Sequence, residues 1–203
     1  MKWTKQADQK SLDNTMKALN ENGVKVIVAE SARDAKEKAL EILPHNAEVM
    51  TMTSETLREL GLETEINESG KFDAVKPKLY SMNRETHGKV MQQIGAAPDW
   101  SIGSVHAVTE DGKVVVASNT GSQLPGYTYG SPHVLWIVGT HKIVKNLDEA
   151  MARIYDHVLP LESERAKKAY GVPGSNVSKL FILNREPNPD RITMILVKEN
   201  VGY

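Results

Sequence analysis

SIGSVHAVTEDGKVVVASNTGSQLPGYTYGSPHVLWIVGTHKIV, residues 101–144, contains three apolar runs that are typical of β-strands. The dipeptide Asp111-Gly112 lies between the first two runs and predicts a tight hairpin turn. The second run leads into Asn119–Ser122, and the third, Val134–Val138, leads into Gly139–Lys142. Glycines and small hydroxyl residues at strand ends present backbone N–H groups to small polar or anionic ligands. The stretch therefore predicts a ligand-binding α/β domain.

Helical and strand patterns alternate in the N-terminal half. Helices are predicted where apolar residues recur at helical spacing, and strands where short apolar runs occur. This order implies parallel strands joined by helical crossovers, hence an α/β sheet with helices on both faces. The predicted elements are a helix through Leu12 and Leu19, a strand at 24–28, a helix from Ser31 to Leu43, a strand at 48–51 and a short helix at 54–60.

The second half adds antiparallel pairing. The hairpin at Asp111-Gly112 requires one antiparallel pair, so the sheet is predicted to be mixed and mostly parallel. Residues 62–80 are polar and poorly periodic, and an exposed excursion and a lid stay open as alternatives for them. The tail runs at 179–183 and 192–197 are predicted as a strand pair that extends the sheet or embraces a partner, so a homo-oligomer stays open. Helices are predicted at 84–94, at 147–158 with its end at Pro160, and at 161–178.

Composition excludes several classes of protein. The chain has 203 residues and is expected to form one domain, residues 1–203. It has no cysteine, which excludes disulfides, zinc thiolate sites and cysteine-ligated iron–sulfur clusters. The charge is −1 with interspersed signs, which argues against nucleic acid as a partner. No apolar run reaches the roughly 18 residues of a membrane span. No signal peptide pattern follows the first residue, so a cytoplasmic location without membrane contact is expected.

Three places are candidate ligand sites. Thr53, Ser54 and Glu55 stand at a strand-to-helix junction, where a carboxyl edge usually binds ligands, although a hydroxyl there also serves as an N-cap. The turn Asn119, Thr120, Gly121 and Ser122 offers a backbone and hydroxyl cradle for a polar ligand, or is an ordinary turn. Thr140 and Lys142 follow the third strand, where the lysine would neutralise a carboxylate or phosphate. For Thr140 and Lys142, the alternative is that they simply mark the end of the strand and the start of a loop.

No residue is assigned a catalytic role. The six histidines lack metal-ligand spacings such as HExxH, so no metal site is predicted. The chain lacks both the P-loop and the GxGxxG pattern, so no cofactor is predicted. His106 is interpreted as a hydrogen-bonded core histidine, and Glu110 and Asp111 as residues of a solvated turn. His141 is a candidate for proton transfer beside Lys142.

Several segments, read together, resemble the LUD domain, the family of lactate utilization protein C. They are Thr53–Leu57 with Leu60-Gly61, Ala107–Gly112, Val138–Val144 and Asn146–Ala150. The resemblance runs from about residue 10 to the C-terminus. It implies a three-layer α/β/α sandwich similar to the NagB/RpiA/CoA-transferase-like superfamily. Many members carry an Ala-Glu-Thr-Gly-Thr type motif where this chain reads Val108–Lys113, which leaves the substrate open.

The resemblance also implies an accessory role beside iron–sulfur partner proteins that oxidise L-lactate, or a related 2-hydroxy acid, to pyruvate. The expected ligand is a small anionic metabolite bound at the carboxyl edge. One alternative is a stand-alone enzyme of the CoA-transferase or sugar-phosphate-isomerase type, with Glu55 or Glu110 as nucleophile or base. Another is a non-catalytic structural subunit with a vestigial pocket.

Overall fold

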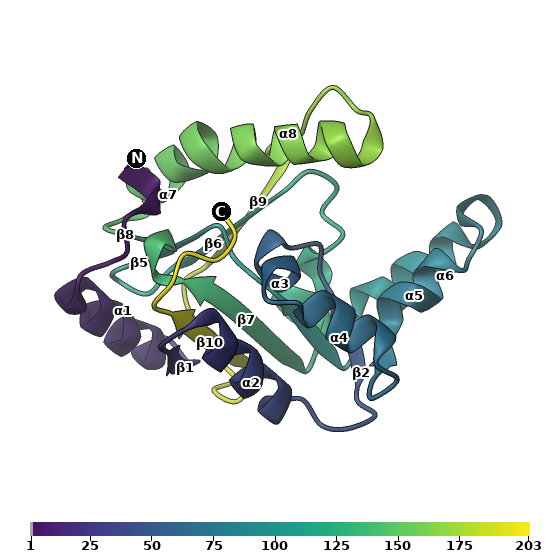
Figure 1. Ribbon diagram of the computed structural model, residues 1–203, viewed down its shortest axis with the longest axis horizontal. Coiled ribbons are helices and arrows are strands. Elements are labelled where there is room, and N and C mark those ends of the chain that lie inside the picture. The colour runs from purple at the N-terminus through teal and green to yellow at the C-terminus, as the bar shows by residue number, and fades with distance from the viewer. Residues whose placement is uncertain (1) are drawn as a thin grey trace.

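The computed structural model describes residues 2–203, and its centre is a six-stranded sheet in which every neighbouring pair is parallel (Figure 1). Its strand order is β1-β10-β7-β4-β2-β3. Because the strands are parallel, all their C-terminal ends lie along one edge, where α/β proteins usually bind ligands. The strands are β1 Val24–Ala29, β2 Glu48–Thr51, β3 Asp73–Ala74, β4 Trp100–Gly103, β7 His133–Gly139 and β10 Ile192–Val197.

The antiparallel pairs belong to a second, four-stranded sheet of order β8-β5-β6-β9. The hairpin turn at Asp111-Gly112 joins β5 to β6, as the sequence predicts. The expectation of one mixed sheet is corrected, because β2 and β7 occupy both edges of β4 and leave the hairpin no place beside it. The second sheet comprises β5 Ala107–Thr109, β6 Val114–Ser118, β8 Ile143–Val144 and β9 Lys179–Leu183.

Helices cover both faces of the central sheet, in a three-layer α/β/α arrangement. In β7, Val134, Trp136 and Val138 pack with α1 and the second sheet, whereas Leu135 and Ile137 pack with α2, α3 and α4. This alternation follows from the period of two in a strand. The helices are α1 Gln9–Glu21, α2 Ala32–Ile42, α3 Glu55–Glu59, α4 Leu62–Glu68, α5 Val75–Tyr80, α6 Arg84–Ala96, α7 Leu147–Arg153 and α8 Leu159–Tyr170.

Residues 62–80 are folded into the body, so of the two alternatives left open by the sequence the exposed excursion is excluded. They form α4, β3 and α5, with Leu62, Ile66 and Val75 fully buried and Leu79 nearly so. The buried residues recur at a spacing of four, but each helix is too short for that pattern to stand out against its polar neighbours. Helix α6, which has no buried residue, packs on α5, and together they form an arm that projects from the body (Figure 1).

The helix that begins at Leu147 does not end at Pro160. It continues through a π-helical turn, Ile154–Val158, into α8, with Pro160 in the first turn of α8. Proline lacks an N–H and its ring collides with the carbonyl four residues earlier. The wider π turn just before Pro160 reduces this conflict. Helix α8 then stops at Gly171, which adopts a left-handed conformation with φ 66°.

The two tail strands do not pair with each other. Strand β10 lies between β1 and β7 in the centre of the parallel sheet, and β9 pairs with β6 at the edge of the second sheet. The difference follows from composition, since β10 is apolar enough to be buried on both faces, whereas β9 exposes Leu180 and Ile182. No helix within residues 2–203 is both long and apolar enough to cross a membrane.

Candidate functional site

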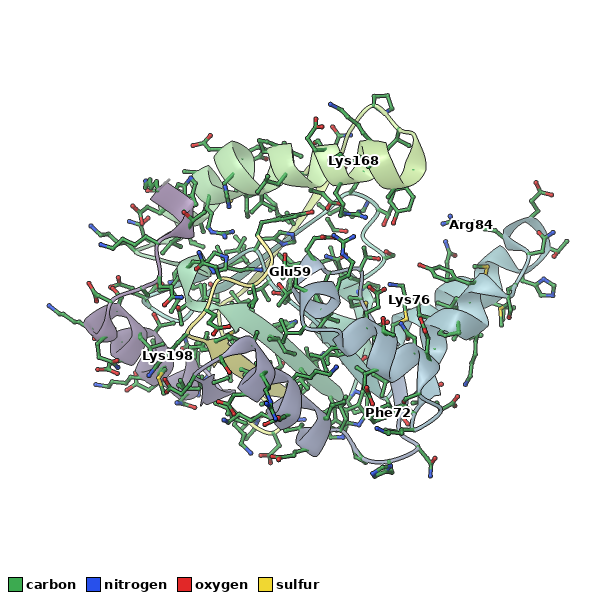
Figure 2. The ribbon with its side chains drawn as sticks, in the orientation of Figure 1. Glu59, Phe72, Lys76, Arg84, Lys168 and Lys198 are labelled. Atoms are coloured by element: carbon green, nitrogen blue, oxygen red, sulfur yellow. The ribbon has the colours of Figure 1, made fainter. Side chains whose placement is uncertain are left out.

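A cleft with a volume of about 1220 Å³ lies at the C-terminal edge of the central sheet. Its floor comes from the residues that follow β2, β4, β6 and β7. Its walls are the arm of α5 and α6 on one side and α8 on the other. Figure 2 shows Lys76 and Arg84 on that arm, with α8, marked by Lys168, beyond the opening. The lining includes four cationic side chains, Lys76, Arg84, Lys142 and Arg165, and two carboxylates, Glu55 and Glu162.

Lys142 is the most deeply placed charged group of the cleft. Only 1% of it is exposed, and its Nζ atom donates hydrogen bonds to Oγ1 of Thr56 at 3.1 Å and to Oγ of Ser104 at 3.2 Å. No carboxylate within residues 2–203 forms an ion pair with it. Burial lowers the pKa of Lys142 from 10.5 to about 7, and the nearby Arg153 guanidinium adds to this effect while Glu59 opposes it. The site therefore holds a lysine that changes charge near neutral pH.

His106 lies beside Lys142 and stays neutral. Its Nδ1 atom accepts a hydrogen bond from the backbone N–H of Ala117 at 3.0 Å, which places the ring proton on Nε2. Burial, with Lys142 and Arg153, lowers the pKa of His106 to about 3. The ring is hydrogen-bonded, as the sequence predicts, but it also lines the cleft, which the sequence does not indicate.

Arg153 is a second buried cation close to this cluster. It is 0% exposed, and its Nη1 atom donates to the carbonyl oxygen of His106 at 2.5 Å. Its Nε and Nη2 atoms are buried and have no hydrogen-bond partner among residues 2–203. Burial lowers the pKa of Arg153 to about 10. The guanidinium therefore adds positive potential at Lys142 and His106, and no described carboxylate forms an ion pair with it.

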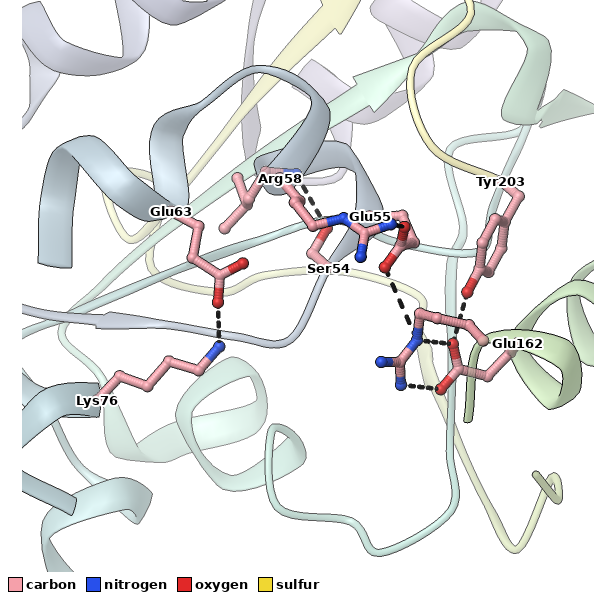
Figure 3. A network of polar contacts seen from close by, with 9 residues as sticks. Ser54, Glu55, Arg58, Glu63, Lys76, Glu162 and Tyr203 are labelled. Atoms are coloured by element: carbon pink, nitrogen blue, oxygen red, sulfur yellow. Dashed lines mark hydrogen bonds and ion pairs between the residues drawn. The ribbon is translucent and has the colours of Figure 1, made fainter. Parts of the chain in front are cut away.

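A network of charged groups lines the cleft beside α8, and Figure 3 shows its contacts. Glu162 accepts hydrogen bonds from Nε and Nη2 of Arg165, both at 2.7 Å, and from the hydroxyl of Tyr203 at 2.6 Å. Burial alone would raise the pKa of Glu162, but the bonds from Arg165 and Tyr203 lower it overall. Tyr203 thus connects the C-terminal segment to α8, and the Arg165 charge is largely neutralised within the network.

Glu55 joins this network from α3. Its carboxylate pairs with Arg58 and lies 3.7 Å from Nε of Arg165 (Figure 3). Burial raises the pKa of Glu55 above its usual value, although Arg58 and Arg165 oppose the shift. On the arm, Lys76 is similarly paired with Glu63. Arg84, by contrast, has no ion-pair partner among the described residues, so its charge is available to a ligand.

The junction between β2 and α3 lies in the cleft, but the hydroxyl of Ser54 already forms a hydrogen bond within the helix. Thr53, Ser54 and Glu55 all line the cavity. Ser54 is the N-cap of α3, and its Oγ atom accepts from the backbone N–H of Leu57 at 3.4 Å. Helix α3 has only five residues, and the pairing of Glu55 with Arg58 covers part of this wall. The capping role is therefore present, and an anion role for the junction stays a prediction.

The turn after β6 also lies in the cleft, and its hydrogen bonds are partly internal. Asn119, Thr120, Gly121 and Ser122 all line the cavity. The N–H of Gly121 donates to Oγ of Ser118 at 2.9 Å, and the N–H of Ser122 to Oγ1 of Thr120 at 3.3 Å. The sequence predicts a backbone cradle here, but these two amides already have acceptors. The side chains are engaged too: Oγ1 of Thr120 donates to Oγ of Ser122 at 3.1 Å, and Oδ1 of Asn119 accepts from Oγ of Ser178 at 3.0 Å. A ligand role for this turn stays a prediction.

Three further candidates lie away from the cleft. Thr140 is buried and does not line the cavity, although it belongs to the same 3-10 turn as Lys142. His141 is buried, and burial lowers its pKa to about 3, so it does not transfer protons at neutral pH. Glu110 accepts a hydrogen bond from Oγ of Ser11 at 2.7 Å and is not a cavity residue. Of the two glutamates proposed as a nucleophile, only Glu55 lies in the cleft.

Several cleft residues were not identified from the sequence. Arg165 lies in a charged stretch that carries no site motif, but its side chain is only 16% exposed and faces Glu55 and Glu162. Ser104 and Tyr203 carry no local signal, because tertiary packing alone brings them to the cleft, and Arg153 lies buried behind its lining. The side chains of His, Asp and Glu in residues 2–203 form no group of three that could hold a metal ion.

Comparison with known proteins supports the architecture. The family described as the LUD domain matches residues 12–197. A search of curated proteins found no significant match. A crystal structure of a DUF162 family protein from Deinococcus radiodurans is similar, with a TM-score of 0.56 and 11% sequence identity over 93% of this chain and 96% of that chain. At that identity the likeness concerns the fold alone. From the family match across most of its length, the chain belongs to the LUD-domain family.

Proposed function

We propose that this LUD-domain protein binds a small organic anion in the cleft and acts as an accessory subunit in the oxidation of L-lactate, or a related 2-hydroxy acid, to pyruvate. The observation that carries the proposal is the state of Lys142. Its amino group is buried, faces the cleft and has two hydroxyl partners but no carboxylate. Buried charges in proteins are normally paired, so a ligand carboxylate is the counter-ion that this site lacks.

The size of the cleft bears on the ligand. Pockets of about 300–1,000 Å³ typically hold drug-sized molecules. The cleft is larger, at about 1220 Å³, so a three-carbon acid would fill only its inner end beside Lys142. The outer part, lined by the exposed Tyr80 and Tyr170, would remain for a longer substrate or for a segment of a partner. The proposal therefore assigns the small acid to Lys142 and leaves the outer cleft to the partner.

The lack of cysteine in the chain supports the accessory role. Oxidation of a 2-hydroxy acid removes two electrons, which need an acceptor. The chain has no cysteine to hold an iron–sulfur cluster, so iron–sulfur partner proteins would supply that acceptor. The LUD domain would contribute the binding of the acid at Lys142, with Ser104, Thr120 and Ser122 as polar contacts.

Calorimetric titration of the purified chain with L-lactate, glycolate and phosphate tests the proposed ligand class. We expect saturable binding of a carboxylate by the wild type and by Lys145→Met, whose lysine is exposed on the same segment. Lys142→Met should bind at least about tenfold more weakly, a loss of about 1.4 kcal/mol. Equal binding by both variants would remove Lys142 from the site. Co-purification with iron–sulfur proteins after expression of neighbouring genes tests the accessory role.

A second candidate function rests on Glu55, whose carboxylate lies in the cleft with a raised pKa. In that case the chain is a CoA-transferase-like enzyme with Glu55 as nucleophile. The ion pair with Arg58 weighs against it, because a nucleophilic carboxylate must be free to attack. A glutamyl thioester on Glu55 that is trapped during incubation with an acyl-CoA would favour this candidate over the accessory role.

A further inference from the structure

We infer that Lys142 is a nucleophile that forms an imine with the keto carbon of a 2-oxo acid bound in the cleft. The inference rests on the proposed function, because it names the substrate class of the same site. It goes beyond that function in assigning a covalent step to a residue that otherwise serves only as a counter-charge. Three features of the site carry it: the hydrogen bonds of the amine, the surrounding charges and the lining of the cleft.

The hydrogen bonds of Lys142 match a neutral amine. The Nζ atom donates to two acceptors, Oγ1 of Thr56 and Oγ of Ser104. A neutral amine has two N–H bonds and one lone pair, whereas an ammonium has three N–H bonds and no lone pair. The third N–H of an ammonium would have no acceptor among residues 2–203, at a position that is 1% exposed. The geometry therefore satisfies the nucleophilic form and leaves its lone pair unused.

The hydroxyl of Thr56 is held in the orientation that this arrangement needs. Its Oγ1 atom donates to the carbonyl oxygen of Val201 at 3.2 Å, so its lone pairs face other donors. Thr56 therefore accepts from Lys142 rather than donating to it. Gly202, the next residue, is fixed by its N–H, which donates to Oε2 of Glu59 at 2.6 Å. The C-terminal segment thus positions an acceptor for the amine.

The charges around Lys142 favour the same form. Burial is the main cause of its lowered pKa, and Arg153 is a neighbouring cation, the two conditions that activate lysine nucleophiles. His106 and His141 also face this cluster and are neutral at physiological pH. Glu59 is the carboxylate that opposes the shift, and it is engaged with the backbone of Gly202. At neutral pH both forms of Lys142 are accessible, so one form pairs with an anion and the other attacks a carbonyl.

The substrate class follows from the rest of the lining. An imine requires a ketone or aldehyde carbon, and the excess of cationic over acidic side chains favours a ligand that also carries a negative charge. Arg84 has no ion-pair partner among the described residues and would bind the distal charge of a longer acid. A 2-oxo acid combines the carbonyl with the carboxylate, and it is the product class of 2-hydroxy-acid oxidation.

The step balances without another reactant. The nitrogen lone pair of Lys142 attacks the keto carbon, a C–N bond forms and the carbonyl electron pair moves to oxygen. Both hydrogens of the amine are transferred to that oxygen, which leaves as water when the C=N bond forms. His106 lines the cleft with its ring proton on Nε2, and we assign this N–H to stabilise the negative charge that develops on that oxygen. Water released from the imine returns on hydrolysis, so the step is reversible.

Reductive trapping tests the inference. The full-length chain is incubated with pyruvate and sodium cyanoborohydride, and the labelled residue is located by peptide mass mapping of the wild-type protein. We expect a carboxyethyl group on Lys142 in preference to every other lysine. Lys142→Met should lose this label and Lys145→Met should keep it. Because mapping uses the wild type, the test does not depend on the folding of a variant.

Parallel measurements with L-lactate and with pyruvate separate this inference from the proposed function. L-Lactate has no keto carbon, so its binding tests the anion site alone. Lactate binding without a label on Lys142 would overturn the imine and leave the anion site in place. Labels spread evenly over exposed lysines would also overturn it. Absence of binding by both lactate and pyruvate would overturn the proposed function, and the imine with it.

Discussion

The Nζ atom of Lys142 donates a hydrogen bond to Oγ1 of Thr56 at 3.1 Å, although 86 residues separate them in the chain. Lys142 follows β7, and Thr56 belongs to the helix that follows β2. Strand β4, which leads to Ser104, lies between these strands in the sheet. The site is therefore assembled from the ends of three adjacent parallel strands, and its geometry depends on the order of the whole sheet.

The stability of the protein should depend on pH through Lys142. The folded protein releases this proton at a pKa of about 7, whereas the unfolded chain holds it to about 10.5. Between these values unfolding takes up a proton, so stability rises with pH by at most about 1.4 kcal/mol per unit from this group. Below pH 7 both states are protonated and the slope vanishes. Urea unfolding of wild type and Lys142→Met from pH 7 to 10 measures it.

Other groups also titrate between pH 7 and 10. The difference in stability between wild type and Lys142→Met isolates the contribution of Lys142. Lys142→Met should be the more stable protein at pH 7, since methionine removes a buried charge at similar length. The wild type should approach it as the pH rises. Lys145→Met, which alters an exposed lysine on the same segment, should follow the wild type. A difference between wild type and Lys142→Met that does not change with pH would contradict the account.

The ring of His106 should be neutral and protonated on Nε2. Its Nδ1 atom accepts from the N–H of Ala117, and burial, with Lys142 and Arg153 beside it, lowers its pKa to about 3. Nitrogen-detected NMR of the imidazole at pH 5 to 7 checks both points. An exposed histidine such as His87 serves as the internal reference. Protonation of His106 within that range, or a proton on Nδ1, would show that the ring is not held as described.

Tyr203→Phe should weaken the network beside α8. The substitution removes the hydroxyl that donates to Glu162 at 2.6 Å, a bond to a charged group in a partly exposed site. We expect a loss of about 1 kcal/mol in the free energy of unfolding. Tyr129→Phe is the matched control, because Tyr129 is 91% exposed and should lose less than about 0.5 kcal/mol. Equal stability of both variants would contradict the structural role of Tyr203.

Two glycines of the cleft region should respond to alanine in opposite ways. A Cβ atom at Gly103 would collide with the hydroxyl of Tyr127, which is fully buried, so Gly103→Ala should cost at least about 2 kcal/mol. A Cβ atom at Gly88 in α6 would meet nothing within 4 Å, so Gly88→Ala should stabilise by up to about 1 kcal/mol. Thermal unfolding of the two variants checks the pair. A tolerated Gly103→Ala would mean that the buried tyrosine can move.

Local signals in the sequence account for much of the fold. Ser54, Asp111-Gly112 and Asn146 act through contacts within four residues, and the structure has a cap, a hairpin and a cap at these places. The interval 62–80 was missed because its buried residues are spread over two short helices. The continuation through Pro160 was missed because a π turn leaves no residue pattern of its own.

For the candidate site, too, the sequence predicts the features that depend on local residues and misses those that depend on distant ones. Strand ends can be located from sequence, so eight of the nine candidate residues line the cleft, Thr140 being the exception. What each residue does depends on partners from other segments. The burial of Lys142, its contact with Thr56 and the approach of Arg165 to Glu55 arise only when β7, α3 and α8 come together. No local pattern encodes such contacts.

Calorimetric titration of L-lactate into the wild type and Lys142→Met in parallel, at a pH about one unit below the pKa of about 7 so that most of Lys142 is charged, tests the central claim most directly. The account predicts saturable binding to the wild type and binding at least about tenfold weaker to a folded Lys142→Met. Equal affinity of the two proteins for the acid would contradict it.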